Sequence, residues 1–218
     1  MSIVIAVDGT AASGKGTLAQ KLARHFGFAH LDSGSLYRLV ALGIADARGD
    51  PNSESDALAA ARAIDPARAI DPRIRSAEIG KAASISSVFP SVRATLLNYQ
   101  RQFAARPPGA VIDGRDIGTV VCPNATAKLF VDAAPEVRAR RRWLELKAAG
   151  QAPDEALILK EIRERDARDR SRTLAPMKPA PDAALLDTSA LDIDAAFEAA
   201  LALVKAKVEE ALKARPKG

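Results

Sequence analysis

A loop of small residues between an apolar strand and a helix constrains this chain most. The segment "SIVIAVDGTAASGKGTLAQKL" (residues 2–22) begins with a β-branched apolar run, which indicates a buried strand. Leu18, Leu22 and Phe26 then recur at four-residue spacing, which predicts a helix from Lys15 that ends at Gly27. A strand, a tight loop and a helix in this order are typical of α/β proteins with a parallel sheet.

The loop itself has the spacing of a phosphate-binding loop, with Gly9, four residues, and then Gly14 and Lys15. Small side chains let backbone N–H groups surround phosphates, the helix N-terminus adds partial positive charge, and Lys15 reaches the β- and γ-phosphates. The alternative is a strand–helix turn without a ligand. The usual Ser or Thr after the lysine is replaced by Gly16. The nucleotide-binding residues predicted here are Gly9, Thr10, Ala11, Ala12, Ser13, Gly14, Lys15, Gly16 and Thr17.

Apolar strands and helices continue to alternate along the chain, which predicts a three-layer α/β fold of the P-loop NTPase type with a central parallel five-stranded sheet. Ligands of such sheets bind at the carboxyl ends of the strands, where five aspartates fall. These are Asp8, Asp32, Asp113, Asp132 and Asp187. The other predicted strands are 28–32, 109–116, 127–133 and 184–189, and the other helices are 33–47, 74–89, 91–105, 135–150, 153–172 and 192–213.

Composition narrows the classes of function. The 218 residues include only 4% aromatics, which is poor provision for stacking nucleic-acid bases, and the net charge of +5 also suits small phosphorylated ligands. No apolar run approaches the roughly 20 residues of a membrane helix. One cysteine, Cys122, suits a reducing compartment. We therefore expect a cytoplasmic protein that binds neither nucleic acid nor membrane.

Further motifs carry a family resemblance. Gly-Lys-Gly-Thr at 14–17 is the loop form of nucleoside monophosphate kinases. Together with "LDSGSLYR" at 31–38, "GRDIGTVV" at 114–121, "KLFVDA" at 128–133 and "ERDARDRSR" at 164–172, it resembles bacterial cytidylate kinases. The resemblance implies transfer of the γ-phosphate of ATP to CMP or dCMP, with Mg²⁺ present, by a monomer.

The resemblance also implies roles for individual residues. Lys15, Arg115 and Arg172 are the expected catalytic residues. Thr17 carries the hydroxyl that Gly16 lacks, and by the resemblance it contacts a nucleotide phosphate, which leaves Mg²⁺ to be held more by phosphates and waters. The expected acceptor-binding residues are Ser33, Arg93 and Asp116 for cytosine, Ser84 near the base, Arg38, Arg115 and Arg172 for the phosphate with Tyr37 beside it, and Arg165 and Asp169 for the sugar. A carboxylate such as Asp116 accepts from the exocyclic amine of cytosine and repels the carbonyl oxygen of uracil, which predicts selectivity. No protein ligand set for a metal is predicted.

Several segments keep two interpretations. Arg165, Asp169 and Arg172 share one face of a charged helix, either as substrate ligands or as solvated ion pairs. The four arginines of "VRARRRW" (137–143) are either lid residues that close over ATP or a solvated basic face. Asp113 is either a magnesium-orienting carboxylate or a plain strand-end aspartate.

A single kinase domain is expected over 1–218, with its core in 1–38, 108–134 and 183–218. An acceptor-binding region is expected over about 39–107 and a helical lid over about 135–182. In many relatives a small antiparallel sheet lies between the second helix and the segment at 74–89. Residues 50–73 are rich in Ala and Pro and show no alternating pattern, so this sheet is predicted to be reduced or missing.

Two other functions stay open at this stage. One is a small-molecule P-loop kinase that uses UMP or a non-nucleotide acceptor. The other is a nucleotide- or RNA-binding module without turnover, against which the low aromatic content argues.

Overall fold

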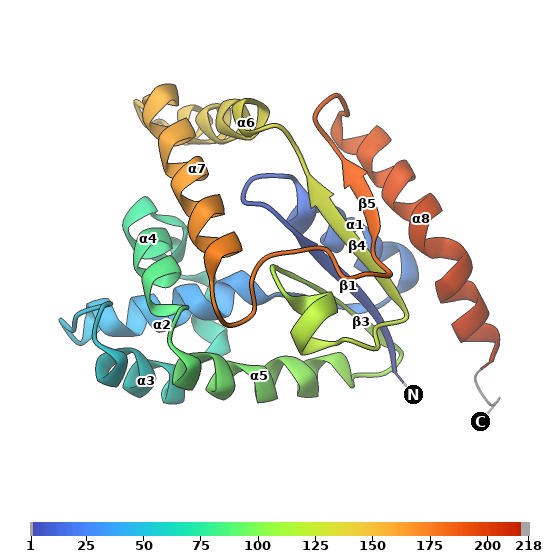
Figure 1. Cartoon of the computed structure of the whole chain (residues 1–218), viewed down its shortest axis with the longest axis horizontal. Helices are drawn as coiled ribbons and strands as arrows, with labels where there is room; N and C mark the ends of the chain where they lie inside the picture. The colour runs from blue at the N-terminus through green and yellow to red at the C-terminus, as the bar shows by residue number, and fades with distance from the viewer. Residues whose placement is uncertain (1, 215–218) are drawn as a thin grey trace. The chain divides into compact units, whose positions relative to one another are not determined.

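A computed structural model describes residues 2–214 of the protein and contains a five-stranded parallel sheet (Figure 1). The strand order is β2-β3-β1-β4-β5, so the strand before the loop is central. This confirms the predicted fold class. The strands are β1 (Ile3–Gly9), β2 (Ala29–Asp32), β3 (Gly109–Gly114), β4 (Ala127–Asp132) and β5 (Ala184–Asp187).

Register brings the strand ends together at one edge of the sheet. Asp8 of β1 pairs in register with Gly114 of β3 and with Phe130 of β4, and Asp132 pairs with Asp187. Because parallel strands share their direction, the aspartates at their carboxyl ends lie along the same edge, as the sequence predicts.

One face of the sheet is covered by α1 (Lys15–Phe26) and α8 (Ile193–Lys213), as Figure 1 shows. Leu18 and Leu22 of α1 and Val204 of α8 are buried against the strand side chains that point to this face. Their helical spacing forms the apolar stripe that drives the packing. Gly27 ends α1 in a left-handed conformation with φ of 66°, as predicted.

Two compact units make up the chain. One contains the sheet and consists of the described residues up to Leu31 and from Ala104 onward; the other is Asp32–Phe103. The second unit is helical, with α2 packed against α3 and α4. Its elements are α2 (Ser33–Asp46), α3 (Glu54–Arg62), the 3₁₀ turns η1 (Pro66–Ile70) and η2 (Pro72–Arg75), α4 (Ala77–Ser86) and α5 (Pro90–Ala104).

Residues 50–80 contain no strand in the structure, which confirms the prediction that the small antiparallel sheet is missing. Asp65 and Asp71 each precede a proline and cap a 3₁₀ turn by accepting a backbone N–H two residues later. This turn chemistry explains why the segment is helical but broken.

The sheet-containing unit also carries a helical hairpin, α6 (Pro135–Ala148) and α7 (Glu155–Ser171), whose helices pack on each other. A π-helical turn, η3 (Ile117–Val121), follows β3 and was not predicted. Among residues 2–214, no helix has the length and apolar character needed to cross a bilayer.

Gly9 is required by the close approach of β4. It has φ of 151°, and a Cβ at this position would lie 1.9 Å from the carbonyl oxygen of Val131. At Gly16, by contrast, a Cβ would meet only the Asp113 carboxylate, at an ordinary contact distance of 3.6 Å.

We therefore expect Gly9→Ala to lower the free energy of unfolding by about 2 kcal/mol or more, because the backbones must separate. The matched variant Gly16→Ala should change it by less than about 1 kcal/mol, because alanine favours a helical first turn. Urea denaturation followed by circular dichroism measures both. Equal stability of the two variants would contradict the steric argument.

Candidate functional site

The loop at 9–17 presents backbone donors at the N-terminus of α1. Gly14, in the left-handed region with φ of 88°, precedes the helix and supplies no capping side chain. The first N–H groups of α1 are therefore not capped by a side chain of that residue, which is the arrangement that binds anions at helix N-termini.

Two hydroxyl groups hold the loop in place. Thr10 Oγ1 donates to the Asp132 carboxylate at 2.6 Å, and Ser13 Oγ donates to the Thr10 carbonyl at 3.0 Å. Both residues are fully buried. The loop is thus anchored to the end of β4, and its conformation is set before any ligand binds.

Lys15 lies beside a buried carboxylate. Its Nζ is 3.7 Å from Asp113 Oδ2, and Asp113 Oδ1 is 2.9 Å from His30 Nε2. Asp113 is 1% exposed, so two partly exposed cationic or polar side chains meet on a buried carboxylate. The contact between His30 and Asp113 was missed in the sequence, because nothing in the spacing of β2 and β3 residues reveals that these strands are neighbours.

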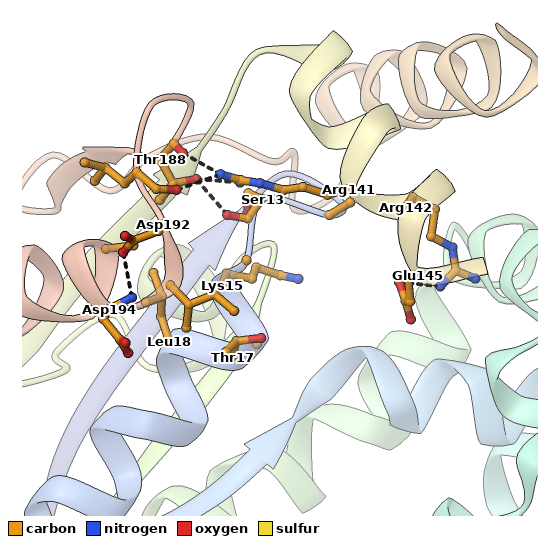
Figure 2. Close-up of a pocket in the computed structure, with 16 residues that line it drawn as sticks. Ser13, Lys15, Thr17, Leu18, Arg141, Arg142, Glu145, Thr188, Asp192 and Asp194 are labelled. Carbon is orange, nitrogen blue, oxygen red and sulfur yellow. Dashed lines mark hydrogen bonds and ion pairs between the residues drawn. The ribbon is translucent and has the colours of Figure 1, made fainter. Parts of the chain in front are cut away.

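A cavity of about 860 Å³ adjoins the loop (Figure 2). Arg141, Arg142 and Glu145 of α6 contribute to one part of its lining, and the segment from Thr188 to Ala196 to another. The loop contributes Ala12 through Thr17. The cavity thus joins the anion-binding loop to a partly apolar space, which is the usual composition of a small-molecule site.

Arg141 links three parts of this cavity wall. It donates to Thr188 Oγ1 at 3.0 Å and to the Thr188 carbonyl at 2.6 Å, and Thr188 Oγ1 in turn donates to the Ser13 carbonyl at 2.9 Å. Figure 2 shows Arg141 extending toward Thr188 and Ser13, while Arg142 pairs with Glu145 at 2.8 Å. Thr188 carried no signal in the sequence.

The four arginines of residues 137–143 therefore have different surroundings. Arg138 is 1% exposed and donates to the Asp166 carboxylate of α7 at 2.7 Å and to the Ala11 carbonyl of the loop at 3.2 Å. It is neither a solvated residue nor a lining residue of the cavity. Arg140 pairs with Glu155 and lies over the ring of Trp143, which makes Trp143 a packing residue of the hairpin.

A second cationic group surrounds Asp169, and we call it the guanidinium cluster: Arg115, Arg165 and Arg172. Arg115 Nε lies 2.9 Å from Asp169 Oδ2 and Arg165 Nε 3.9 Å from it, and Arg172 donates to Oδ1. Asp169 is 2% exposed. The predicted shared face of 165, 169 and 172 is thus observed, although α7 ends at Ser171 and Arg172 has extended backbone with ψ of 133°.

Apart from Asp116, the other predicted acceptor residues lie in the helical unit. Arg38 of α2 donates to the carbonyls of Ile74 and Ser76, so its guanidinium is fixed against the start of α4. The guanidinium of Arg93 lies 5.7 Å from the ring centre of Tyr37 and donates to the Ser87 carbonyl. Two further residues, Ser33 and Ser84, are buried.

The sheet-containing unit thus contains two cationic groups. Lys15 and its loop lie at the start of α1, and the guanidinium cluster comes from the segment after β3 and from the end of α7. Asp116 follows Arg115, directly precedes η3 and is 6% exposed. Paired arginines and an amide-lined loop are both anion sites, and phosphoryl transfer needs such groups far more than it needs a base.

Comparison with known proteins agrees with this chemistry. The family model for cytidylate kinase matches residues 5–206. A cytidylate kinase of Nitrobacter winogradskyi is 56% identical over 93% of this chain and 96% of its own length. The cytidylate kinase of Bradyrhizobium diazoefficiens is 54% identical over 94% of this chain and 96% of its own length.

Among solved structures, a shikimate kinase from Bacteroides thetaiotaomicron is similar in fold, with a TM-score of 0.50, 14% identity, and coverage of 93% of this chain and 98% of its own. At this identity the likeness concerns the fold alone. The family match and the relatives above half identity decide the assignment: the chain belongs to the cytidylate kinase family.

Proposed function

We propose that the protein transfers the γ-phosphate of ATP to CMP or dCMP, and that the guanidinium cluster binds the acceptor phosphate. The observation that carries the proposal is the presence, in one unit of a cytidylate kinase family member, of an amide-lined loop and three arginines gathered on one carboxylate. Each can neutralise one of the two phosphate groups that react.

The loop and the adjoining cavity would hold ATP. Backbone N–H groups of residues 9–17 would surround the phosphates, and the rest of the nucleotide would occupy the space beside Leu18, Arg141 and Arg142. Arg141 is already fixed by Thr188, so it would bind with little loss of side-chain entropy.

Mg²⁺ would neutralise charge on the ATP phosphates when it is bound. The Thr17 hydroxyl, which faces the cavity, and the Asp113 carboxylate are oxygen donors of the kind that suits this ion, directly or through water. Gly16 leaves open the space beside Asp113 that a Ser or Thr side chain occupies in the usual loop.

On the acceptor side, we propose that Ser33, Arg93 and Asp116 bind cytosine with Ser84 near it. Arg38, Arg115 and Arg172 would bind the phosphate with Tyr37 beside it, and Arg165 and Asp169 would bind the sugar. Guanidinium forks bind a phosphate dianion through parallel hydrogen bonds, which supports the assignment of the arginines. Asp169 would then exchange at least part of its contact with Arg115 and Arg172 for contact with substrate.

Catalysis in this proposal is positioning and charge neutralisation. Lys15, Arg115 and Arg172 would contact the transferred phosphoryl group and its neighbours. The hairpin of α6 and α7, within the region 135–182, would act as the lid, and 39–107 would bind the acceptor. We further propose a cytoplasmic location, which the single cysteine supports, and a monomeric state, which the family resemblance implies.

Acceptor choice is the first test. We expect the highest kcat/KM with CMP or dCMP and a value lower by about two orders of magnitude or more with UMP, because a uracil carbonyl would face Asp116. Steady-state kinetics with CMP, dCMP, UMP and AMP at saturating Mg-ATP, with coupled detection of ADP, measures this. A preference for UMP over CMP would overturn the acceptor assignment, and tight ATP binding without transfer to any acceptor would overturn the kinase.

Lys15→Ala should lower kcat by about two orders of magnitude or more, because it removes a cation that the transition state needs. The contact between Lys15 and Asp113 is long, at 3.7 Å, and we expect the melting temperature to change far less than kcat. Lys205→Ala on α8, where the lysine pairs with Glu209, is the matched control and should leave kcat unchanged. A kcat for Lys15→Ala equal to that of the control would remove Lys15 from the mechanism.

A further inference from the structure

The turn that follows Arg115 and Asp116 is unusual in its backbone. Residues Ile117–Val121 form a π-helical turn in which the N–H groups of Val120 and Val121 donate to the Asp116 carbonyl at 2.9 and 3.1 Å. The Cys122 N–H closes it by donating to the Ile117 carbonyl at 2.7 Å. Such wide turns are rare, and they concentrate at functional sites.

A buried carboxylate on the neighbouring strand holds the start of this turn. Asp8 Oδ1 accepts the Ile117 N–H and Asp8 Oδ2 accepts the Gly118 N–H, both at 2.7 Å. Asp8 is 3% exposed and lies at the carboxyl end of β1, in register with Gly114 of β3. Both carboxylate oxygens are thus used on the two residues directly after Asp116.

Packing leaves the turn little freedom to shift. A Cβ at Gly118 would lie 3.1 Å from Lys128 Cδ and 3.3 Å from Asp8 Oδ2, closer than ordinary contacts. Lys128 is itself held, because its ammonium donates to the Pro123 carbonyl and to the Asp182 carboxylate. The turn therefore packs tightly between the Asp8 carboxylate and the aliphatic part of Lys128, and neither side chain can move away easily.

Burial raises the pKa of Asp8 to about 7, although the N–H groups of Gly118 and Ile117 act in the opposite direction. Asp116 adds to the increase, and Arg115 reduces it. Burial disfavours the charged form of a carboxylate. The two hydrogen bonds from the turn stabilise that form and offset part of the cost of burial.

We propose that Asp8 is a positioning residue for acceptor recognition: it fixes the π-helical turn and thereby orients Arg115 and Asp116. This inference rests on the proposed function, in which these two residues bind the phosphate and the base of CMP. Asp8 does not touch the acceptor in this proposal. It acts through Ile117 and Gly118, and Arg115 is held at its other end by Asp169.

Asp8→Asn is the direct test, because an amide keeps one acceptor oxygen and turns its nitrogen, a donor, toward the other N–H. We expect kcat/KM for CMP to fall about tenfold or more, the ratio of kcat/KM for CMP over UMP to fall with it, and the KM for ATP to stay within about twofold. Gly118→Ala should act in the same direction, because its Cβ would press on Lys128 and Asp8, and it changes no residue of β1 or the loop. Glu209→Gln, the same carboxylate-to-amide change at a residue of α8 that pairs with Lys205, is the control. It should leave kcat/KM for CMP, the ratio of CMP over UMP and the KM for ATP unchanged.

Folding of each variant is checked by circular dichroism, and Gly118→Ala carries the test if Asp8→Asn does not fold. An unchanged preference for CMP over UMP in the folded variants, or an equal rise in the KM values of CMP and ATP, would overturn the inference and leave Asp8 a structural residue. Failure of the proposed function is a separate result, since it would appear as absent CMP turnover in the unsubstituted protein.

Discussion

Two phosphate groups repel each other, so a protein that brings them together has to supply positive charge to both. The groups that carry this charge also have to keep fixed positions. This constraint accounts for much of what lies at the carboxyl edge of the sheet. The loop at 9–17 supplies its positive potential through backbone N–H groups, which are fixed by the course of the chain. The guanidinium cluster supplies formal charges, and Asp169 keeps the three arginines from repelling one another.

The buried ion pair between Arg138 and Asp166 positions the helices of the hairpin more than it stabilises the fold. Arg138 and Asp166 are almost fully buried, and removing two charges from water costs several kcal/mol that their attraction only partly returns. The pair nevertheless joins both helices of the hairpin, and Arg138 also reaches the Ala11 carbonyl of the loop. A hairpin tied to the phosphate loop in this way can respond to what the loop binds, which suits its proposed role as a lid.

Much of this organisation could be predicted from the sequence, because it depends on local patterns. Apolar runs predicted the strands, the spacing of Leu18 and Leu22 predicted α1, and the Ala- and Pro-rich composition of 50–73 predicted a reduced or missing sheet. The loop was recognisable because its glycine spacing is dictated by backbone geometry, as the contact of Gly9 with Val131 illustrates. Arg165, Asp169 and Arg172 were singled out by the family resemblance, and their spacing predicted that they share one face.

The missed features depend on contacts between distant segments. Nothing near Ile117 in the sequence indicates a π-helical turn, because its first N–H groups are satisfied by Asp8, more than a hundred residues away. Arg138 and Arg141 lie three residues apart in the same arginine-rich run, and only the fold buries the one and turns the other to the cavity. The structure of a complex with Mg²⁺, CMP and an unreactive ATP analogue would test the central claim most directly. We expect the CMP phosphate within hydrogen-bond distance of Arg115 and Arg172, and the analogue's phosphates on the N–H groups of residues 9–17. A CMP phosphate bound elsewhere, with Arg115 and Arg172 still hydrogen-bonded to Asp169, would contradict the proposed acceptor site.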